Sequence, residues 1–252
     1  LDVTDPMLNG VDYVPDSTFI TAYFVVTNTV LDTFSSATYS NNYGSTNWVG
    51  NWVETDALGG GATAGVVQIY SNQLQLTDTV TPDPNIYRRV NLTNATDATL
   101  SFDYSTSAPV DADDQMTLDV STNGSTWTVM SNFLGEVAGS ASFSLLPYRS
   151  SGTYIRFRSS AGYNSTSSNE FFWVDNIQIT RTVAGTQTVA GAAAPDFLTG
   201  YTLPPGGSIS IVFTGSIDAV YGVTNTACVT SDQLIAELCD TIVNTVDPEA
   251  NP

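Results

Sequence analysis

The stretch MTLDVSTNGSTWTVM, residues 116–130, decides the fold class. Apolar and polar residues alternate over residues 116–120 and again over residues 127–129, and side chains two positions apart share one face of a β-strand. Asn123 and Gly124 lie between the two runs and tolerate the positive φ angles of a tight hairpin turn. The stretch therefore predicts two antiparallel strands joined at this Asn-Gly pair.

The same alternation recurs through residues 30–180, where short apolar runs are separated by Gly, Ser and Asn. It is clearest in TLSFDYS (residues 99–105), TYIRFRSS (residues 153–160) and FFWVDNIQIT (residues 171–180). About ten such strands without helical periodicity predict an all-β fold, a β-sandwich with jelly-roll character rather than a parallel sheet.

The charge balance is strongly acidic. The 252 residues contain 25 Asp and Glu against 6 Arg, with no Lys and no His, and the net charge is -19. Nucleic acid is a poor partner for such a chain, because binding phosphate needs clustered cationic side chains. A negative surface instead suits solubility and divalent cations. No apolar stretch approaches the ~20 residues of a membrane-spanning helix, and we expect an exported, soluble protein without a membrane span.

The missing residue types exclude several kinds of catalysis. Without His or Lys the chain cannot form a Ser-His-Asp triad, a Schiff base or a histidine-ligated zinc site. Paired carboxylates could serve a glycosidase, but the acids lie mainly in turn-like segments, with no sign of a cleft built around two of them. We therefore predict that the protein is not an enzyme.

Cys228 and Cys239 lie in ACVTSDQLIAELCDT, residues 227–241, where two strand-like runs flank a short polar turn. The two side chains could therefore face each other across a hairpin. A disulfide is the favoured interpretation over two free buried thiols, and it would support an oxidising, extracellular location.

The alternating block contains, in order, VLDTFSSATYSNNYGSTNWVGNWVET (residues 30–55), RRVNLTNATDATLSFDYS (residues 88–105), MTLDVSTNGSTWTVM, TYIRFRSS and FFWVDNIQI. Together these segments resemble the MAM-like jelly-roll modules that are common in bacterial extracellular proteins. The resemblance implies a β-sandwich and often a structural calcium ion, and it does not imply catalysis.

The flanks contain VTDPMLNGVDYVPDST (residues 3–18), APDFLTGYTLPPGGSISIVF (residues 194–213), GVTNTACVTSDQ (residues 222–233) and DTIVNTV (residues 240–246). They resemble successive segments of the Ig-like repeat domain that occurs in tandem on bacterial surface proteins. We therefore expect residues 1–30 and 181–252 to form an Ig-like β-sandwich, with residues 31–180 inserted into one of its loops as a jelly-roll β-sandwich.

The Ig-like family pattern normally has one or two further strands before the segment that matches VTDP, and these are absent here. Such a domain would have an apolar groove and an open sheet edge, which is a template for another strand. A strand from a neighbouring subunit could fill the gap, as in donor-strand assemblies, and head-to-tail contacts of this kind build filaments. Alternatively, the sequence is a fragment or the domain has fewer strands. The candidate donors are LDVTDP (residues 1–6) and CDTIVNTVDPEANP (residues 239–252), and the second can equally be the last strand of its own domain.

The jelly-roll resemblance also implies a calcium site, and carrying it over residue by residue points to Asp32, Glu54, Asp56 and Asp175. The first and last strands of such a sandwich can be neighbours, and calcium takes about six to eight oxygen ligands in flexible geometry. The alternative is that Asp32 and Asp175 cap turns or accept hydrogen bonds from backbone amides.

A further acidic cluster contains Asp111, Asp113 and Asp114. It lacks the Gly and the final Glu of an EF-hand loop, so a solvated acidic turn is favoured over a second cation site. The neighbouring pairs Arg88 with Arg89 and Arg156 with Arg158 do not form a basic patch, and we expect ion pairs with the excess acids.

Exposed aromatic rings can stack on sugars, which makes Tyr39, Tyr43 and Tyr163 candidates for carbohydrate binding. The four tryptophans lie in apolar patterns and are expected in the core: Trp48, Trp52, Trp127 and Trp173. Four N-x-[ST] sequences predict N-glycosylation in an exported protein: Asn91, Asn94, Asn123 and Asn164.

The favoured function is that of a structural subunit of an extracellular assembly or filament on a microbial cell surface. Its partners would be copies of itself or neighbouring surface-protein domains, joined by β-strand complementation. The alternative is an adhesive or carbohydrate-binding module of a larger secreted protein, with glycans as its partners.

Overall fold

The computed structural model describes residues 1–7, 11–56, 58–77, 84–107, 110–159, 170–217 and 223–244. It confirms the all-β class, because strands supply nearly all of the regular structure in these ranges. The helical turns described there are both of the 3-10 type, η1 (Gly61–Thr63) and η2 (Leu146–Tyr148). None of the helical segments in this part of the chain has the length and apolar character needed to cross a membrane.

The chain forms two compact units. The first unit contains residues 1–25 and 184–252, and the second unit contains residues 26–183, so the second lies within the sequence of the first. Two long strands, β3 (Phe19–Asp32) and β13 (Phe171–Val189), contribute residues to both units.

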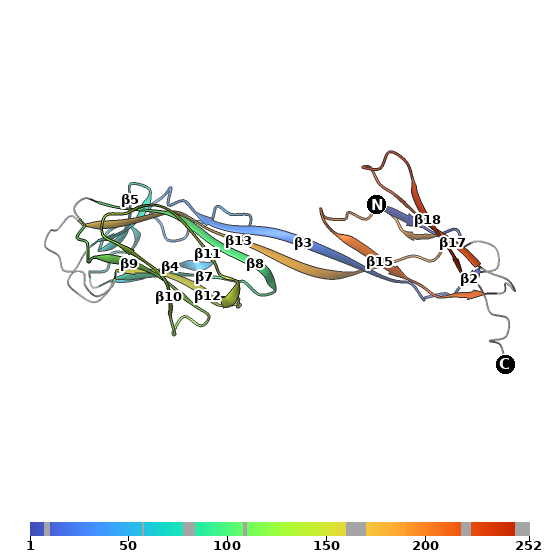
Figure 1. Ribbon diagram of the computed structural model, residues 1–252, viewed down its shortest axis with the longest axis horizontal. Coiled ribbons are helices and arrows are strands. Elements are labelled where there is room, and N and C mark those ends of the chain that lie inside the picture. Colours follow the sequence, from blue (N-terminus) through green and yellow to red (C-terminus); the bar gives the residue numbers. More distant parts are fainter. Residues whose placement is uncertain are drawn as a thin grey trace. The chain divides into compact units, whose positions relative to one another are not determined.

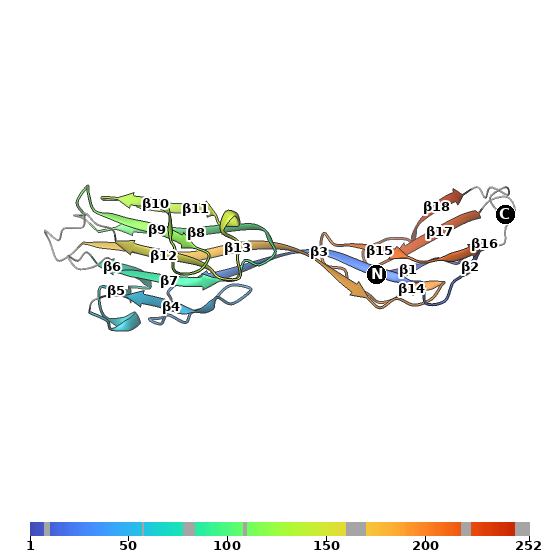
Figure 2. The ribbon, with the colours of Figure 1, turned by 90° about the horizontal axis from the view of Figure 1, so that it is seen from below.

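The second unit contains two sheets (Figures 1 and 2). One sheet has the strand order β10-β9-β12-β7-β4, and all its pairings are antiparallel. Its strands are β4 (Val49–Thr55), β7 (Asn85–Val90), β9 (Gln115–Ser121), β10 (Thr128–Leu134) and β12 (Thr153–Ser159).

The other sheet of this unit follows the order β11-β8-β13-β3, and β6 joins it by pairing with β13 and β5. Its remaining strands are β5 (Val67–Tyr70), β6 (Gln73–Thr77), β8 (Ala95–Thr106) and β11 (Ala138–Ser144).

The predicted hairpin at Asn123 is confirmed, since β9 and β10 pair with Thr128 opposite Val120. Asn123 Oδ1 accepts the backbone N–H groups of Ser125 and Thr126 at 2.8 and 2.9 Å. The side chain thus closes a six-residue connection, residues 122–127, rather than a two-residue turn.

Alternate residues of the facing sheets form one buried apolar cluster, as the period of two predicts. Leu100 and Phe102 of β8 and Leu118 of β9 belong to it, and every member of the cluster lies in the second unit. Burying a side chain of this size contributes about 1.5–3 kcal/mol as an upper estimate. The core therefore provides most of the stabilisation of this unit.

Two of the four tryptophans do not follow the prediction. Trp48 and Trp52 are buried in the cluster, but Trp127 and Trp173 are only partly buried and lie outside it. Trp127 precedes β10, and its ring packs against the Arg156 guanidinium, 4.0 Å from the ring centroid. A ring in a connection can cover the outer face of a sheet instead of entering the core.

The first unit has a four-stranded antiparallel sheet in the order β14-β1-β17-β18 (Figure 2). Its strands are β1 (Asp2–Thr4), β14 (Asp196–Leu198), β17 (Val223–Thr230) and β18 (Leu238–Asn244). Elsewhere in this unit β15 (Ser208–Val212) pairs with β3, and β16 (Gly215–Ile217) pairs with β2 (Val11–Tyr13).

This arrangement bears on the two candidate donor strands. The segment LDVTDP supplies β1, which is an inner strand paired with β14 on one side and β17 on the other. The C-terminal candidate supplies β18, which pairs with β17 as the last strand of its own sheet. Both strands are therefore used within their own unit, and residues 245–252 of the C-terminal candidate lie outside the described residues.

Few apolar side chains of the first unit are buried. Among its described residues they are Ile20, Ala22, Phe197 and Leu198. Phe197 also stacks on Phe213, with ring centroids 4.5 Å apart. A core of this size provides little burial to offset the entropy of ordering the chain.

Candidate functional site

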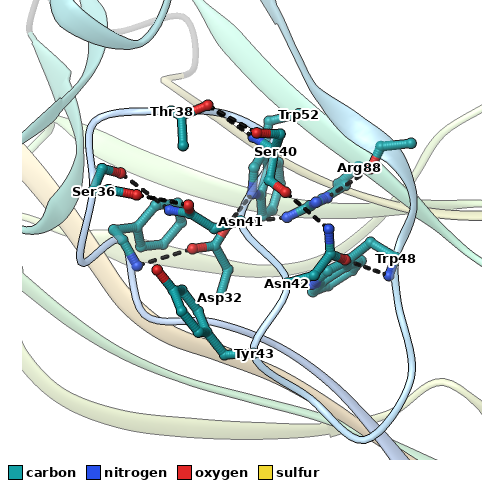
Figure 3. Close-up of polar contacts among 12 residues, drawn as sticks. Asp32, Ser36, Thr38, Ser40, Asn41, Asn42, Tyr43, Trp48, Trp52 and Arg88 are labelled. Atoms are coloured by element: carbon teal, nitrogen blue, oxygen red, sulfur yellow. Dashed lines mark hydrogen bonds and ion pairs between the residues drawn. The ribbon is translucent and has the colours of Figure 1, made fainter.

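Asp32, the first residue of the predicted calcium site, lies in a buried polar centre at the end of β3 (Figure 3). Its Oδ2 accepts hydrogen bonds from Trp52 Nε1 and from Arg88 Nη1, each at 2.9 Å. Its Oδ1 accepts the backbone N–H of Phe34 at 2.9 Å. The side chains of Asp32 and Arg88 are both fully buried, so this is an ion pair inside the core of the second unit.

The surroundings of Arg88 are aromatic. Its guanidinium lies 4.9 Å from the Trp48 ring centroid and 5.7 Å from that of Trp52, and its Nε donates to the Gly50 carbonyl at 3.0 Å. Such contacts stabilise a desolvated cation. The sequence predicted that Arg88 would find an acid, but gave no sign that the pair would be buried.

Burial acts against the charged form of both partners. It raises the pKa of Asp32, while the Phe34 N–H, Trp52 and Arg88 act to lower it. Burial likewise lowers the pKa of Arg88 to about 10, with Asp32 acting in the opposite direction. Since each charge is held by the other, removing one partner exposes the full cost of burying the remaining charge.

The loop after β3 curls over this ion pair and is held by its own polar side chains (Figure 3). Asn41 Nδ2 donates to the Ser36 carbonyl at 3.0 Å, and Ser36 Oγ donates to Asn41 Oδ1 at 2.8 Å. Asn42 Oδ1 accepts a hydrogen bond from the Trp48 backbone N–H at 2.8 Å, which fixes the backbone of one of the two tryptophans beside Arg88. The loop therefore closes the polar centre from solvent.

Asp56 and Glu54 hold the Gly-rich loop that follows β4. Asp56 Oδ2 accepts the N–H groups of Val66 and Val67 at 2.9 and 3.2 Å, and Oδ1 accepts those of two further loop residues, Leu58 and Gly59. Glu54 Oε1 accepts the Gly61 N–H at 2.9 Å. These carboxylates already have N–H donors directed at them, which is an unfavourable setting for a cation.

Asp175, the fourth predicted ligand, accepts the N–H of Asn176 at 2.7 Å. Burial raises the pKa of Asp175, and the negative charges of Asp103 and Asp32 raise it further, so Asp175 lies within electrostatic reach of Asp32. Hydrogen bonds to backbone amides, the alternative considered for Asp32 and Asp175, are thus present for both. In the described part of the chain, no three of the four predicted carboxylates have ligand atoms within 4.8 Å of one another, and calcium binding by this set stays a prediction.

The predicted sugar-binding tyrosines lie in different environments. Tyr39 is partly buried and donates its hydroxyl hydrogen to Glu54 Oε2 at 2.5 Å, and the same hydroxyl lies 3.0 Å from the Val67 carbonyl oxygen. Burial and the neighbouring Glu54 strongly raise the pKa of Tyr39. Tyr43 is 48% exposed and accepts a hydrogen bond from Ser35. Tyr163 lies outside the described residues.

Three of the four predicted glycosylation sites are described, and all three asparagines are exposed: Asn91, Asn94 and Asn123. Asn164 lies outside the described residues. The exposure satisfies the steric requirement for modification, and the use of these sites stays a prediction.

The remaining predicted ion pairs meet at a buried acid that no sequence pattern indicated. Arg156 Nη2 and Arg158 Nε both contact Asp119 Oδ2 at 2.7 Å, and Asp119 is buried on β9. Arg89 differs from the prediction, because its guanidinium donates to the Ser151 carbonyl at 2.9 Å. The alternating pattern of β9 does not indicate that Asp119 is an ion-pair partner, because an acid within a strand is usually expected to face solvent.

The clearest open surface of the first unit is the β17–β18 hairpin. In the described part of both strands no side chain is buried. Among the described strands β18 is the last of its sheet, and its apolar residues Leu238, Ile242 and Val243 are 62%, 59% and 66% exposed. We call the outer side of β18 the open edge.

The predicted disulfide is confirmed. Cys228 and Cys239 are opposite one another in the β17–β18 register, and a disulfide joins them. The bond closes a loop with a sequence separation of 11 residues and ties the open edge to its neighbouring strand.

No protein-family model matches the chain, and no curated protein matches it at a significant level. Among solved structures, the chain is similar to the K2 cleaved adhesin domain of Lys-gingipain, with 14% identity over 60% of this chain and 98% of that chain, and a TM-score of 0.38. It is also similar to the glycoside hydrolase domain of Endo-D from Streptococcus pneumoniae R6, with 10% identity, 86% of this chain and 43% of that chain covered, and a TM-score of 0.34. At these TM-scores the two structures do not assign the chain to a family or an activity, and the MAM-like and Ig-like resemblances stay predictions.

Proposed function

We propose that the protein is a structural subunit of an extracellular surface assembly, in which the open edge of β18 accepts an extended segment of another copy. The observation that carries this proposal is the exposure of Leu238, Ile242 and Val243 on an edge strand. An edge strand presents unpaired backbone N–H and C=O groups, and natural proteins usually protect such edges. An apolar edge favours β-strand addition.

The small core of the first unit supports the same conclusion. Its described buried apolar residues are only Ile20, Ala22, Phe197 and Leu198, and the β17–β18 hairpin adds no buried side chain. An added strand would cover the side chains of β18 that alternate on each face. It would also extend the sheet by main-chain hydrogen bonds, so the unit gains stability on assembly.

A second, different edge makes an open-ended assembly feasible. β15 pairs with β3 and is the last strand in the order β11-β8-β13-β3-β15. Its Val212 is 59% exposed. Pairing of β18 in one copy with β15 in the next is a heterologous contact, which does not close on itself and therefore propagates as a filament. The disulfide at Cys228 holds β18 in register before the partner arrives, which lowers the entropic cost of binding.

The location follows from the same bond. A disulfide persists in oxidising compartments and is rare in the cytosol, which supports an extracellular site of action. With a net charge of -19, copies of the chain repel one another, so added salt should promote assembly by screening this repulsion.

Replacing Ile242 with lysine should block assembly, because a charge on the open edge opposes strand addition. We expect the concentration needed for polymer formation to rise at least ~10-fold, measured by light scattering and negative-stain electron microscopy at increasing salt, in line with a loss of about 1.4 kcal/mol or more per contact.

Val129→Lys is the matched control. Val129 is 52% exposed and lies on β10, an edge strand of the second unit, so it receives the same charge in a similar setting. This variant should assemble like the unmodified chain. The proposal would be contradicted if the unmodified chain stayed monomeric at high concentration and high salt. It would also be contradicted if Ile242→Lys formed polymers at the same concentration as the control.

An adhesive or carbohydrate-binding module is the second candidate, and the exposure of Tyr43 favours it. The ring is 48% exposed in the polar loop that follows β3, and an exposed aromatic face can stack on a sugar ring. On a glycan array, Tyr43→Ala should weaken the affinity for the bound glycan by ~10-fold or more. Tyr70→Ala changes another exposed ring, which is 58% exposed, and should leave the affinity unchanged. Absence of binding by the unmodified chain would argue against this candidate.

A further inference from the structure

Three carboxylates meet in the second unit, away from the set first predicted for calcium. Asp111 and Asp114 lie in the connection before β9, and Glu170 lies directly before β13. One oxygen from each of the three carboxylates lies within 4.8 Å of the others. Asp113, which the sequence grouped with the two aspartates, is exposed and does not belong to this group.

Hydrogen bonds join the chain near the two segments, at Ser107 and Phe171. The Phe171 N–H donates to Ser107 Oγ at 2.9 Å, and the Ser107 N–H donates to the Phe171 carbonyl at 3.0 Å. The Asp114 N–H closes a turn on the Asp111 carbonyl at 3.1 Å. The three carboxylates are therefore brought together by ordered backbone rather than by flexible side chains alone.

The cluster is largely removed from water. Asp114 is 0% exposed and Glu170 is 1% exposed, while Asp111 is partly buried. Within the described residues, Glu170 Oε2 is buried and has no hydrogen-bond donor. A buried carboxylate oxygen without a donor is costly, and a cation bound to it offsets that cost.

We propose that Asp111, Asp114 and Glu170 bind a calcium ion. Calcium prefers carboxylate oxygens at about 2.3–2.6 Å, so oxygens that share one ion lie within roughly 5 Å of one another, which the cluster satisfies. Magnesium is smaller, demands near-octahedral geometry and keeps several waters, which fits a buried group of three carboxylates less well. The ion links the connection before β9 to the start of β13.

The experiment is thermal unfolding of the full chain, followed by tryptophan fluorescence, in EDTA and in calcium. All four tryptophans lie in the second unit, so the signal reports the unit that holds the cluster. Calcium about 100-fold above its Kd should raise the Tm by roughly 5–10 °C, and magnesium at the same concentration by much less.

Three variants separate this site from the alternatives. Glu170→Gln keeps the shape and removes one charge, so the calcium-induced rise in Tm should be lost while stability in EDTA is kept or increased. Asp113→Asn changes an exposed acid in the same connection and should keep the full rise. Asp175→Asn should also keep it, because Asp175 belongs to the other predicted set.

The proposal is overturned if calcium leaves the Tm of the unmodified chain unchanged, or if Glu170→Gln responds as strongly as the unmodified chain. Should Glu170→Gln fail to fold, Asp111→Asn at the partly buried position replaces it. Native mass spectrometry of the unmodified chain then counts the bound calcium directly, and a count of zero also overturns the proposal.

Discussion

Replacing Asp32 with alanine should lower the free energy of unfolding of the second unit by about 3–5 kcal/mol. The substitution removes the acceptor for Arg88, Trp52 and the Phe34 N–H at once, and it leaves the Arg88 guanidinium fully buried without its counter-ion. An uncompensated buried charge is among the largest single-residue penalties in a folded protein.

Urea unfolding followed by tryptophan fluorescence measures this effect, because Trp48 and Trp52 flank the ion pair. The control is the double variant Asp32→Leu with Arg88→Met, which replaces both charges by apolar groups of similar size. It should recover part of the lost stability, because it removes the unpaired charge, while Trp52 and the Phe34 N–H remain without their acceptor. The prediction would be wrong if Asp32→Ala lowered the free energy of unfolding by less than about 1 kcal/mol, or if the double variant were less stable than the single one.

Replacing both cysteines with serine should destabilise the first unit by about 3 kcal/mol on the chain-entropy model of a loop this short. The bond closes the connection between β17 and β18, and the small core of this unit offers little else to hold the hairpin. We therefore expect the first unit to unfold before the second in the variant with Cys228→Ser and Cys239→Ser.

The two units can be followed separately in this experiment. The first unit contains no tryptophan, so the fluorescence transition should be unchanged, while far-UV circular dichroism should show an earlier transition for the first unit. Amide hydrogen exchange in β17 provides a local measurement of the same loss. An earlier fluorescence transition, or unchanged exchange in β17, would contradict the expected confinement of the effect to the first unit.

The elements that the sequence predicted correctly depend on short-range patterns. Alternation over residues 116–120 and the turn side chain of Asn123 fix the β9–β10 hairpin, and both act between residues that are close in sequence. The disulfide between Cys228 and Cys239 is of the same kind, because two runs joined by a short turn can pair in few registers. Local periodicity and turn chemistry thus determined the all-β class and this pairing.

The roles of the charged residues were not determined locally. Asp32 and Arg88 are 56 residues apart, and nothing near either residue indicates that both enter the core. Glu170 likewise joins Asp111 and Asp114 only because β13 begins beside the connection that precedes β9. The same carboxylate is a solvated turn residue, a buried ion-pair partner or a cation ligand, depending on which strands become its neighbours.

The sequence by itself determined that this protein is an acidic chain of all-β type without the side chains for histidine or lysine catalysis, and it favoured the disulfide that the structure contains. The tertiary structure decided which acids are buried, which carboxylates meet, and that β18 is left as an apolar edge. The physical reason is the range of the interactions: strand period and turn geometry act over a few residues, whereas desolvation and charge pairing depend on the whole fold.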